Sequence, residues 1–415
     1  MTCHTWGVAD QRNVIILGST GSIGTQAVDV ISTRRDQFRV TGLSAGGSDI
    51  PTLAAQVLEL APEVVALARP TVVQDLQLAL YAEASKRGWN KGDVVLPRII
   101  AGPDASTELA AMPADVVLNG ITGSAGLLPT LATLAAGTTL ALANKESLVI
   151  GGRLVTGAAA PDQIVAVDSE HSAFAQALRA GRKDEVRRLI LTASGGPFRG
   201  RRRDKLTEVT PEQAMAHPTW AMGRVITINS STLVNKGLEL LEAGLLYDVP
   251  LDDVVAVVHP QSIVHSMVEF HDGSTIAQVS PPDMRLPIGL GLTWPDRMAE
   301  AARPNDWTQA ATWTFEPLDN EAFPAVDLAR HCGKLGGSAP AVFNAANEEC
   351  VDAFCDGRLS FLGIVDTVAE VVADHVNGMG DGHLTDDQLS VEGVLAADAW
   401  ARTRAGERIS RGASA

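Results

Sequence analysis

Two carboxylates lie close together near the middle of the chain, in the stretch VDSEHSAF at 167–174. Asp168 and Glu170 follow an apolar run that is typical of a buried strand. On an extended segment, residues two apart point to the same side, so both carboxylates could converge at the carboxyl end of that strand. Without a cation they would repel each other, and the pKa of one would rise. Solvated acids at an ordinary strand end are the alternative.

A third acid occurs in the stretch NSSTLVNKGLELLEAG at 229–244. Ser230 is predicted to cap a helix on which Asn235 and Glu239, four residues apart, share a face with Lys236 beside it. Three carboxylates without Cys or His at ligand spacing favour Mg²⁺ or Mn²⁺ over zinc. A surface helix with a Lys and a Glu three residues apart is the alternative interpretation.

Donors for an anion occur near these acids in the sequence. The stretch ASGG at 193–196, Ser230 and Asn235 offer hydroxyl and amide groups. The stretch HPTWAMG at 217–223 is typical of a loop that could close over a bound anion, although a His and a Trp in a loop more often serve packing. The sequence therefore predicts an anionic small molecule beside the metal.

A glycine-rich loop, GSTGSIG at 18–24, follows the apolar run NVIIL and precedes a helical pattern. Gly18, Gly21 and Gly24 would allow a tight turn and let backbone N–H groups meet a pyrophosphate at the helix N-terminus. A plain glycine turn is the alternative. The stretch GLSAGGS at 42–48 has no acid for a ribose 2′-hydroxyl, which favours NADP over NAD, but it also has no basic residue for a 2′-phosphate.

Strand and helix patterns alternate through the first part of the chain, which predicts an α/β fold with an N-terminal Rossmann-like doubly wound domain. Strands are expected at FRVTGLSA, EVVALA, ADVVLNG, TTLALAN and QIVAVD. The middle is expected to be an α+β catalytic domain with a strand at RVITIN (224–229), a helix capped by Thr210, and a hairpin around Asp272-Gly273. Helical periodicity then dominates. The predicted division is 1–168, 169–300, a linker at 301–325, and a helical domain at 326–415.

Composition narrows the functional class. A chain of 415 residues with 46% hydrophobic residues is expected to be globular with more than one domain. Its net charge of −16 argues against nucleic acid as a partner.

The opening residues lack the apolar core of a secretory signal, and no apolar stretch is long enough for a membrane span, so a cytoplasmic protein is expected. The cysteines show no metal spacing; they are Cys3, Cys332, Cys350 and Cys355.

Seven stretches, taken together and in this order, closely resemble the 1-deoxy-D-xylulose-5-phosphate reductoisomerase family. They are GSTGSIGTQ, ANKESLV, VDSEHSA, ASGGPF, HPTWAMG, NSSTLVNKGLE and HPQSIVHSMVEF. The resemblance covers residues 13 to about 400. The occurrence of VDSEHSA and NKGLE in one chain is highly specific. The resemblance implies NADPH and Mg²⁺ or Mn²⁺ as cofactors, a sugar phosphate as substrate, and a homodimer.

The resemblance also implies a role for each matching residue. The metal ligands are Asp168, Glu170 and Glu239, which with Lys145 and Lys236 form the catalytic set. The substrate-binding residues are Ser169, Ser194, His217, Trp220, Met222, Ser230, Asn235, Lys236 and His265. The implied phosphate ligands among them are Ser194, His217, Ser230 and Asn235. The NADPH-binding residues are Gly18, Thr20, Gly21, Ser22, Ile23, Gly46, Gly47, Asn144, Glu146 and Gly223.

The implied reaction rearranges 1-deoxy-D-xylulose 5-phosphate to a branched aldehyde, which NADPH reduces to 2-C-methyl-D-erythritol 4-phosphate. A metal chelated by a carbonyl and a neighbouring hydroxyl oxygen suits such a rearrangement. The chain departs from the family at Gly47, where a lysine is frequent. Two alternatives remain open: another NADP-dependent dehydrogenase, which would need a catalytic cysteine, and a non-catalytic NADP sensor, which has no use for three converging acids.

Overall fold

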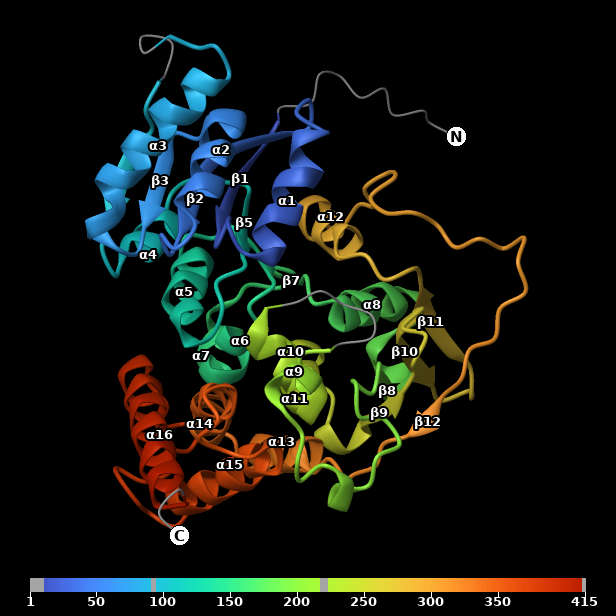
Figure 1. The fold of residues 1–415 in the computed structure, drawn as a ribbon. Coiled ribbons are helices and arrows are strands. Elements are labelled where there is room, and N and C mark those ends of the chain that lie inside the picture. The colour runs from blue at the N-terminus through green and yellow to red at the C-terminus, as the bar shows by residue number, and fades with distance from the viewer. Residues whose placement is uncertain (1–10, 91–94, 217–222, 413–415) are drawn as a thin grey trace. The chain divides into compact units, whose positions relative to one another are not determined.

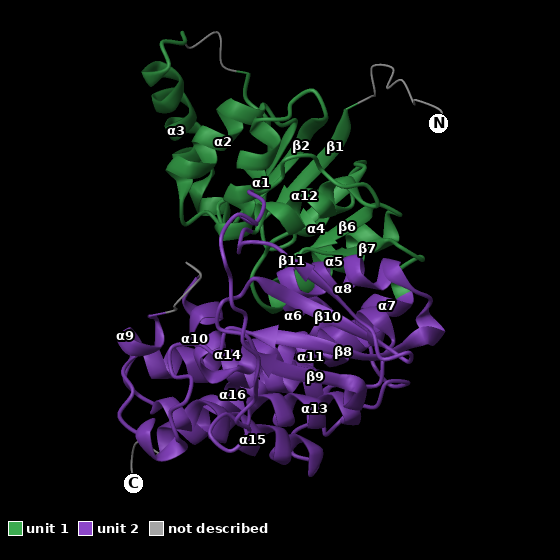
Figure 2. Ribbon diagram, turned by 90° about the vertical axis from the view of Figure 1, so that its right-hand side faces the viewer, with its two compact units in different colours: residues 1–144, 158–167, 284–302 green, residues 145–157, 168–283, 303–415 purple. Residues whose placement is uncertain are grey.

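The computed structural model describes residues 11–90, 95–216 and 223–412. The chain forms two compact units, each built from separate segments (Figures 1 and 2). The first unit comprises residues up to 144 together with 158–167 and 284–302, and the second comprises 145–157, 168–283 and 303 onward. Among the described residues, no helix has both the length and the apolar character that a membrane span requires.

The first unit contains a parallel sheet covered by helices, which confirms the predicted doubly wound fold. Its strands, in spatial order, are β4 (Arg98–Ala101), β3 (Val64–Leu67), β2 (Phe38–Ala45), β1 (Arg12–Leu17), β5 (Val116–Asn119), β6 (Thr139–Leu142) and β7 (Ile164–Ala166). The helices are α1 (Ser22–Ser32), α2 (Ile50–Leu60), α3 (Val73–Lys86), α4 (Ala105–Ala110), α5 (Leu127–Ala135) and α12 (Arg285–Thr293).

Burial explains why the central strand of this unit is a continuous apolar run. The four residues 14–17 of β1 are at most 1% exposed, because helices cover both faces of the sheet. Helix α12 arrives from far along the sequence: Arg12 donates a hydrogen bond to the carbonyl oxygen of Leu292 at 2.8 Å, and the helix packs against α1. The unit thus needs residues well beyond its N-terminal segment to complete its core.

The second unit contains a mixed five-stranded sheet. Its strands, in spatial order, are β11 (Thr275–Val279), β10 (Val264–Phe270), β8 (Val186–Ala193), β9 (Val254–Val258) and β12 (Glu316–Pro317). Strands β8 and β9 are parallel and the other pairs are antiparallel. The predicted hairpin is confirmed, since β10 pairs with β11 and Gly273 in their turn has φ +88°.

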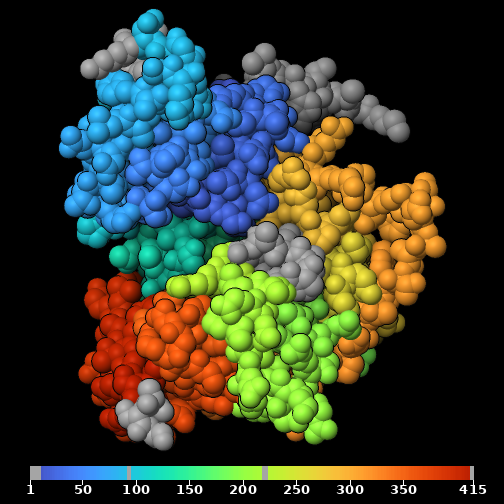
Figure 3. All heavy atoms as spheres, in the orientation of Figure 1, coloured from blue at the N-terminus to red at the C-terminus, as the bar shows by residue number. Residues whose placement is uncertain are grey.

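Helices make up the rest of the second unit. They are α6 (Lys145–Gly151), most of α7 (Arg153–Ala158), α8 (Ser169–Ala177), α9 (Pro211–Ala214), α10 (Arg224–Thr232), α11 (Val234–Tyr247), α13 (Ala325–Leu335), α14 (Ala339–Cys355), α15 (Phe361–Val376) and α16 (Val391–Gly412). The C-terminal helices, orange to red in Figure 3, share one hydrophobic core with the sheet, in which Phe343 and Phe354 belong to the same cluster as Leu191. The predicted C-terminal helical region is confirmed.

Two local predictions are wrong, and they concern the adjoining residues 224–229 and Ser230. The stretch 224–229, predicted as a strand from its β-branched residues, forms α10 instead. Its buried residues Thr227, Ile228 and Ser231 recur at helical spacing. Ser230 therefore lies inside α10, and the N-cap of α11 is Leu233 in a left-handed conformation with no side-chain cap. The predicted cap of α9 is confirmed, because Thr210 accepts a hydrogen bond from the backbone N–H of Gln213.

Candidate active site

The first two acids lie where β7 ends and α8 begins, and not on one extended segment as predicted. Asp168 is the N-cap of α8, and its carboxylate accepts a hydrogen bond from the backbone N–H of Glu170 at 3.2 Å. Glu170 lies in the first helical turn, where an acid is stabilised by the helix dipole. A strand-to-helix turn thus brings both carboxylates to one place, although the physical reason differs from the prediction.

The third acid comes from the middle of α11. Glu239 is 1% exposed, and Asn235, one turn earlier, donates a hydrogen bond to its carboxylate. One oxygen from each of Asp168, Glu170 and Glu239 can be chosen so that all three lie within 4.8 Å of one another. The structure therefore brings together three acids that lie up to 71 positions apart in the sequence.

Two buried lysines are interleaved with these acids. Lys145, at the start of α6, donates to Glu239 at 2.9 Å and to the side-chain oxygen of Asn235 at 3.0 Å, and it forms an ion pair with Asp168. Lys236 on α11 lies 2.8 Å from a carboxylate oxygen of Glu170 and also pairs with Glu239. We call these five residues, Lys145, Asp168, Glu170, Lys236 and Glu239, the acid–lysine centre.

The pKa shifts follow from this arrangement. Burial acts to lower the pKa of Lys145, but Asp168 and Glu239 outweigh it and hold that pKa well above its usual value. Burial would raise the pKa of Asp168, but Lys145 outweighs it and keeps the pKa below its usual range. For Glu239, burial and the nearby Glu170 raise the pKa to about 7, against the opposing effect of both lysines. The charge of Glu239 thus changes near neutral pH.

A second buried pair, which the sequence analysis missed, supports the centre. The side chains of His171 and Glu242 are 0% and 1% exposed, and an imidazole nitrogen lies 3.1 Å from a carboxylate oxygen without hydrogen-bond alignment. Burial lowers the pKa of His171 to about 4 and raises that of Glu242 well above its usual value. The pair connects α8 to α11, the two helices that carry the acids. Glu242 lies three residues after Glu239, a spacing that could have revealed it.

The donor set fits a hard divalent cation. All three converging groups are carboxylates, and Mg²⁺ and Mn²⁺ prefer oxygen ligands. The three acids and two lysines have a formal net charge of −1, so a divalent ion would make the centre positive and attractive to an anionic substrate. His171 and Glu242 form another possible three-ligand group with Asp168, but it includes an imidazole and is more deeply buried. The all-oxygen group matches the predicted ion better.

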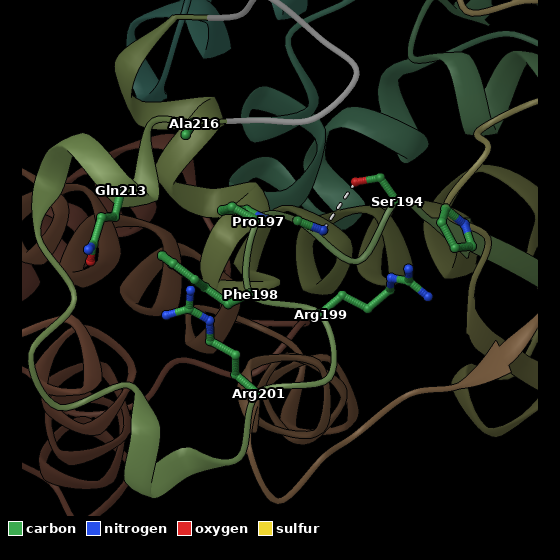
Figure 4. A pocket seen from close by; sticks show the side chains of 9 residues that line it. Ser194, Pro197, Phe198, Arg199, Arg201, Gln213 and Ala216 are labelled. Atoms are coloured by element: carbon green, nitrogen blue, oxygen red, sulfur yellow. Dashed lines mark hydrogen bonds between the residues drawn. The ribbon is translucent and has the colours of Figure 1, made fainter.

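The predicted phosphate-binding residues come from two neighbouring segments. Ser194 follows β8 and accepts a hydrogen bond from the backbone N–H of Gly196 at 3.2 Å (Figure 4). A Cβ atom at Gly196 would lie 3.0 Å from the carbonyl oxygen of Ser230, so this loop packs directly against the end of α10. Asn235 follows two residues into α11. The structure therefore places Ser194, Ser230 and Asn235 in one region of the second unit.

A cavity of about 540 Å³ opens beside Ser194. Its lining includes Phe198, Arg199, Arg201 and Gln213, which Figure 4 shows around the same loop. Arg199 pairs with Glu316 at 2.6 Å, and the Arg201 guanidinium lies 5.3 Å from the Phe198 ring centroid. Two arginines, Arg199 and Arg201, therefore line this cavity.

Of the remaining predicted substrate-binding residues, two lie next to the acid–lysine centre and three lie outside the described residues. Ser169 donates to the Glu170 carboxylate. His265 on β10 is 7% exposed and within hydrogen-bonding distance of the Ser280 carbonyl at 3.1 Å; burial lowers its pKa, which Glu170 acts to raise. Both therefore adjoin the acid–lysine centre. His217, Trp220 and Met222 lie outside the described residues.

The glycine loop of the first unit has the geometry of a phosphate cradle. Gly18 has φ +74°, and a Cβ there would lie 2.8 Å from the carbonyl oxygen of Gly120. A Cβ at Gly24 would collide with the backbone of Gly18 and Ser19. Gly21 is the N-cap of α1 and provides no side chain to cap it, so the first N–H groups of the helix, from Ser22 onward, can meet an anion. These features fit a dinucleotide pyrophosphate.

The other predicted NADPH residues come from both units. Thr20 and Ile23 belong to the glycine loop and the start of α1, and Gly46 and Gly47 follow β2. Asn144 is buried after β6, and its amide donates to the carbonyl oxygen of Gly123 at 3.1 Å. In the second unit, burial raises the pKa of Glu146, which lies on α6, and Gly223 is the N-cap of α10.

Family models match most of the chain. A model for 1-deoxy-D-xylulose 5-phosphate reductoisomerase matches residues 14–152, one for the C-terminal domain of that enzyme matches 164–247, and one for the DXP reductoisomerase C-terminal domain matches 279–404. Curated relatives include the reductoisomerase of Cutibacterium acnes, 67% identical with 97% of this chain and 99% of the relative covered. That of Kitasatospora griseola is 61% identical, with 95% and 99% covered.

Solved structures of reductoisomerases are similar to this chain over almost its full length. The chain is similar to the Zymomonas mobilis reductoisomerase in complex with NADPH at 40% identity and a TM-score of 0.84, with 96% of this chain and 99% of that chain covered. It is also similar to a reductoisomerase in complex with NADPH, fosmidomycin and magnesium, at 33% identity and a TM-score of 0.86, with 96% and 98% covered. Fold and site define an α/β oxidoreductase with a buried carboxylate centre. The chain belongs to the 1-deoxy-D-xylulose 5-phosphate reductoisomerase family.

Proposed function

We propose that this protein converts 1-deoxy-D-xylulose 5-phosphate to 2-C-methyl-D-erythritol 4-phosphate by isomerisation and reduction, with NADPH and Mg²⁺ or Mn²⁺, in non-mevalonate isoprenoid biosynthesis. The observation that carries the proposal is the convergence of Asp168, Glu170 and Glu239 within 4.8 Å, in a chain of this family. In support, two related reductoisomerases have been solved with NADPH, one of them also with magnesium.

The acid–lysine centre would hold the metal through its three carboxylates. A divalent ion bound there supplies Lewis acidity toward a carbonyl and an adjacent hydroxyl oxygen. Lys145 and Lys236 are charged and already bonded to the metal-binding carboxylates, so each can keep those oxygens in place and offer an N–H to a substrate oxygen. Ser169 and His265 would line the reacting end.

Substrate orientation would depend on the phosphate. The hydroxyl and amide donors of Ser194, Ser230 and Asn235 would bind the phosphate end of the substrate. We propose His217 as a further phosphate ligand. Trp220 and Met222 would help exclude water from the reacting end. A substrate anchored at its phosphate and at its two metal-binding oxygens has little freedom left, which favours a single direction of rearrangement.

NADPH supplies the hydride, and the protein supplies its position. The glycine loop with Gly18, Thr20, Gly21, Ser22 and Ile23 would hold the pyrophosphate, and Gly46, Gly47, Asn144, Glu146 and Gly223 would complete the site. We propose that residues 1–168 provide most of the NADPH site and 169–300 most of the metal and substrate site, to which Lys145 and Asp168 also belong, with the 301–325 linker leading to a supporting helical domain at 326–415.

The chemistry of the cysteines weighs against a cysteine-dependent dehydrogenase. Burial raises the pKa of Cys332 and that of Cys350 to about 12 each, so neither forms a thiolate nucleophile at neutral pH. Burial also raises the pKa of the partly exposed Cys355. Among the described residues, the thiols thus resemble packing groups, and their free state suits a cytoplasmic location.

We also propose a homodimer. Strand β11 lies at the edge of its sheet, and its Ile276 is 38% exposed. Trp307 and Phe315, between α12 and β12, are also exposed large apolar residues. An open sheet edge and exposed aromatic side chains are features that a second copy of the chain could cover. Sedimentation equilibrium of the purified protein would decide between monomer and dimer.

The direct test of the proposed reaction follows NADPH absorbance after the protein has been treated with a chelator. Oxidation that requires both 1-deoxy-D-xylulose 5-phosphate and added Mn²⁺ or Mg²⁺, with one 2-C-methyl-D-erythritol 4-phosphate formed per NADPH, is expected. NADPH binding without consumption, with metal and sugar phosphate present, would favour the sensor alternative.

A further inference from the structure

The turn after β2 is the place where a dinucleotide-binding fold distinguishes NAD from NADP. In such folds an acid near the end of the second strand binds the ribose 2′-hydroxyl of NAD, whereas a nearby arginine accommodates the 2′-phosphate of NADP. In this chain β2 ends at Ala45 and is followed by Gly46 and Gly47. The first acid beyond them, Asp49, is the N-cap of α2 and accepts a hydrogen bond from the backbone N–H of Thr52 at 3.1 Å. Its carboxylate is thus engaged in capping.

A cation reaches this turn from the neighbouring strand. Arg69 follows β3, the strand paired with β2, and its Nε donates to the carbonyl oxygen of Gly46 at 3.1 Å. One of its terminal nitrogens, Nη2, donates to the carbonyl oxygen of Gly47. The guanidinium is therefore fixed over the turn, although no residue in the turn itself is basic. No local sequence pattern indicates this contact, because Arg69 is 22 positions from Gly47.

The Arg69 guanidinium retains capacity for an anion. Of the five N–H groups of an arginine side chain, the two bonds to the turn use two, which leaves three. Arg69 is exposed, and within the described part of the chain it has no carboxylate in ion-pair distance. A planar guanidinium with free N–H groups is well suited to a phosphate dianion, which it can bind through two parallel hydrogen bonds.

The turn cannot easily provide the cation itself. Gly47 has φ +88°, a conformation that residues with a side chain rarely adopt. A Cβ there would also lie 2.7 Å from a methyl carbon of Val72. A basic side chain at position 47 would thus be strained in two ways, whereas Arg69 reaches the same turn without strain in the glycine backbone.

We propose that Arg69 binds the 2′-phosphate of NADPH and is the residue that sets the preference of this chain for NADPH over NADH. The inference rests on the proposed function, because that function requires NADPH. It adds the residue that recognises the phosphate group distinguishing the two nucleotides.

Equilibrium binding of NADPH and of NADH to the full chain, followed by nucleotide fluorescence, tests this. In Arg69→Gln, the dissociation constant for NADPH should rise about 10- to 100-fold, as expected for the loss of charge-assisted hydrogen bonds, whereas that for NADH should change less than about two-fold. Arg69→Lys keeps the charge and should lose less than the glutamine variant. NADH binding serves as an internal check that the site is folded.

Arg39→Gln is a matched control on β2, the strand that leads into the turn. Arg39 lies near the amino end of β2, away from the turn, and pairs with Glu63 at 2.6 Å. Its NADPH and NADH affinities should match those of the wild type. An unchanged ratio of the two affinities in Arg69→Gln would overturn the proposal, and so would an equal loss of both, which would show that Arg69 only shapes the turn. A wild-type protein that binds NADH as tightly as NADPH would also overturn it. Because binding is measured without turnover, failure of the proposed reaction is a separate result.

Discussion

The acid–lysine centre and the glycine loop are suited to their ligands by opposite means. The centre places five ionisable side chains in a largely buried position, where each charge is stabilised by another. The glycine loop has no charged side chain at 18–24 and offers backbone N–H groups made accessible by the absence of Cβ atoms. The centre should therefore be sensitive to changes of charge, and the loop to changes of volume.

The largest effect is expected at the centre. Glu239→Gln keeps the shape of the side chain and removes one of three negative ligands, so turnover should fall about 1,000-fold or more, as is usual when a catalytic metal loses a ligand charge. NADPH affinity should stay within about two-fold, because the glycine loop does not depend on this charge. Steady-state kinetics and nucleotide titration would measure both. Turnover like that of the wild type would remove the basis for the metal assignment.

The second effect concerns volume in the loop. Gly24→Ala adds a Cβ that would collide with the backbone of Gly18 and Ser19, so the cradle must open. NADPH affinity should fall about 50-fold, corresponding to roughly 2 kcal/mol of backbone strain, while Mn²⁺ affinity should remain unchanged. Gly406→Ala on α16, where a Cβ would meet nothing within 4 Å, is the control and should change neither affinity. Equal NADPH affinity in both variants would contradict the cradle.

The third effect is a pH dependence of metal binding. The pKa of Glu239 is raised to about 7, so the carboxylate is protonated below that pH and must lose a proton to bind a cation. Mn²⁺ affinity should therefore fall about ten-fold from pH 8 to pH 6, because the ionised fraction of Glu239 falls by that factor. Titrations monitored by the Mn²⁺ EPR signal would show it. The slope should disappear in Glu239→Gln; a slope that persists there would assign the proton to another group.

The smallest effect separates charge from packing in the supporting pair. Burial raises the pKa of Glu242 well above its usual value and so favours the neutral form, which glutamine resembles; Glu242→Gln should therefore change Mn²⁺ affinity less than about three-fold. Glu242→Ala leaves a cavity beside His171 and should lower stability by about 2–4 kcal/mol and Mn²⁺ affinity about ten-fold. Thermal unfolding and metal titration would compare the two. If the glutamine variant were as impaired as the alanine variant, the charge of Glu242 would be essential.

The sequence predicts helices, strands and turns correctly where the local pattern and the tertiary packing favour the same structure. The apolar run of β1 with its glycine turn, the Thr210 cap and the hairpin at Gly273 are all confirmed. The stretch 224–229 misled because its β-branched residues favour a strand, while packing against α11 and α14 makes it a helix. Likewise, Asp168 and Glu170 converge through a helix cap and not along a strand.

Local sequence patterns do not predict contacts between residues that lie far apart in the sequence. The interleaving of Lys145 with Asp168 and Glu239, the burial of Glu242 against His171, and the reach of Arg69 to the turn after β2 all depend on which elements become neighbours. The sequence resemblance supplied Lys145. It did not supply Arg69, which lies in none of the matching stretches, nor Glu242, whose spacing from Glu239 was the only signal in the sequence. The assignments of individual site residues remain predictions for the experiments above.

A crystal structure grown with Mn²⁺, with anomalous diffraction recorded above the manganese absorption edge, would show directly whether the three carboxylates bind the metal. A single strong anomalous peak about 2.2 Å from one oxygen each of Asp168, Glu170 and Glu239 is predicted, as expected for a divalent ion with carboxylate ligands. A peak at any other position, in crystals of protein whose turnover requires Mn²⁺, would show that these three carboxylates do not bind the catalytic metal.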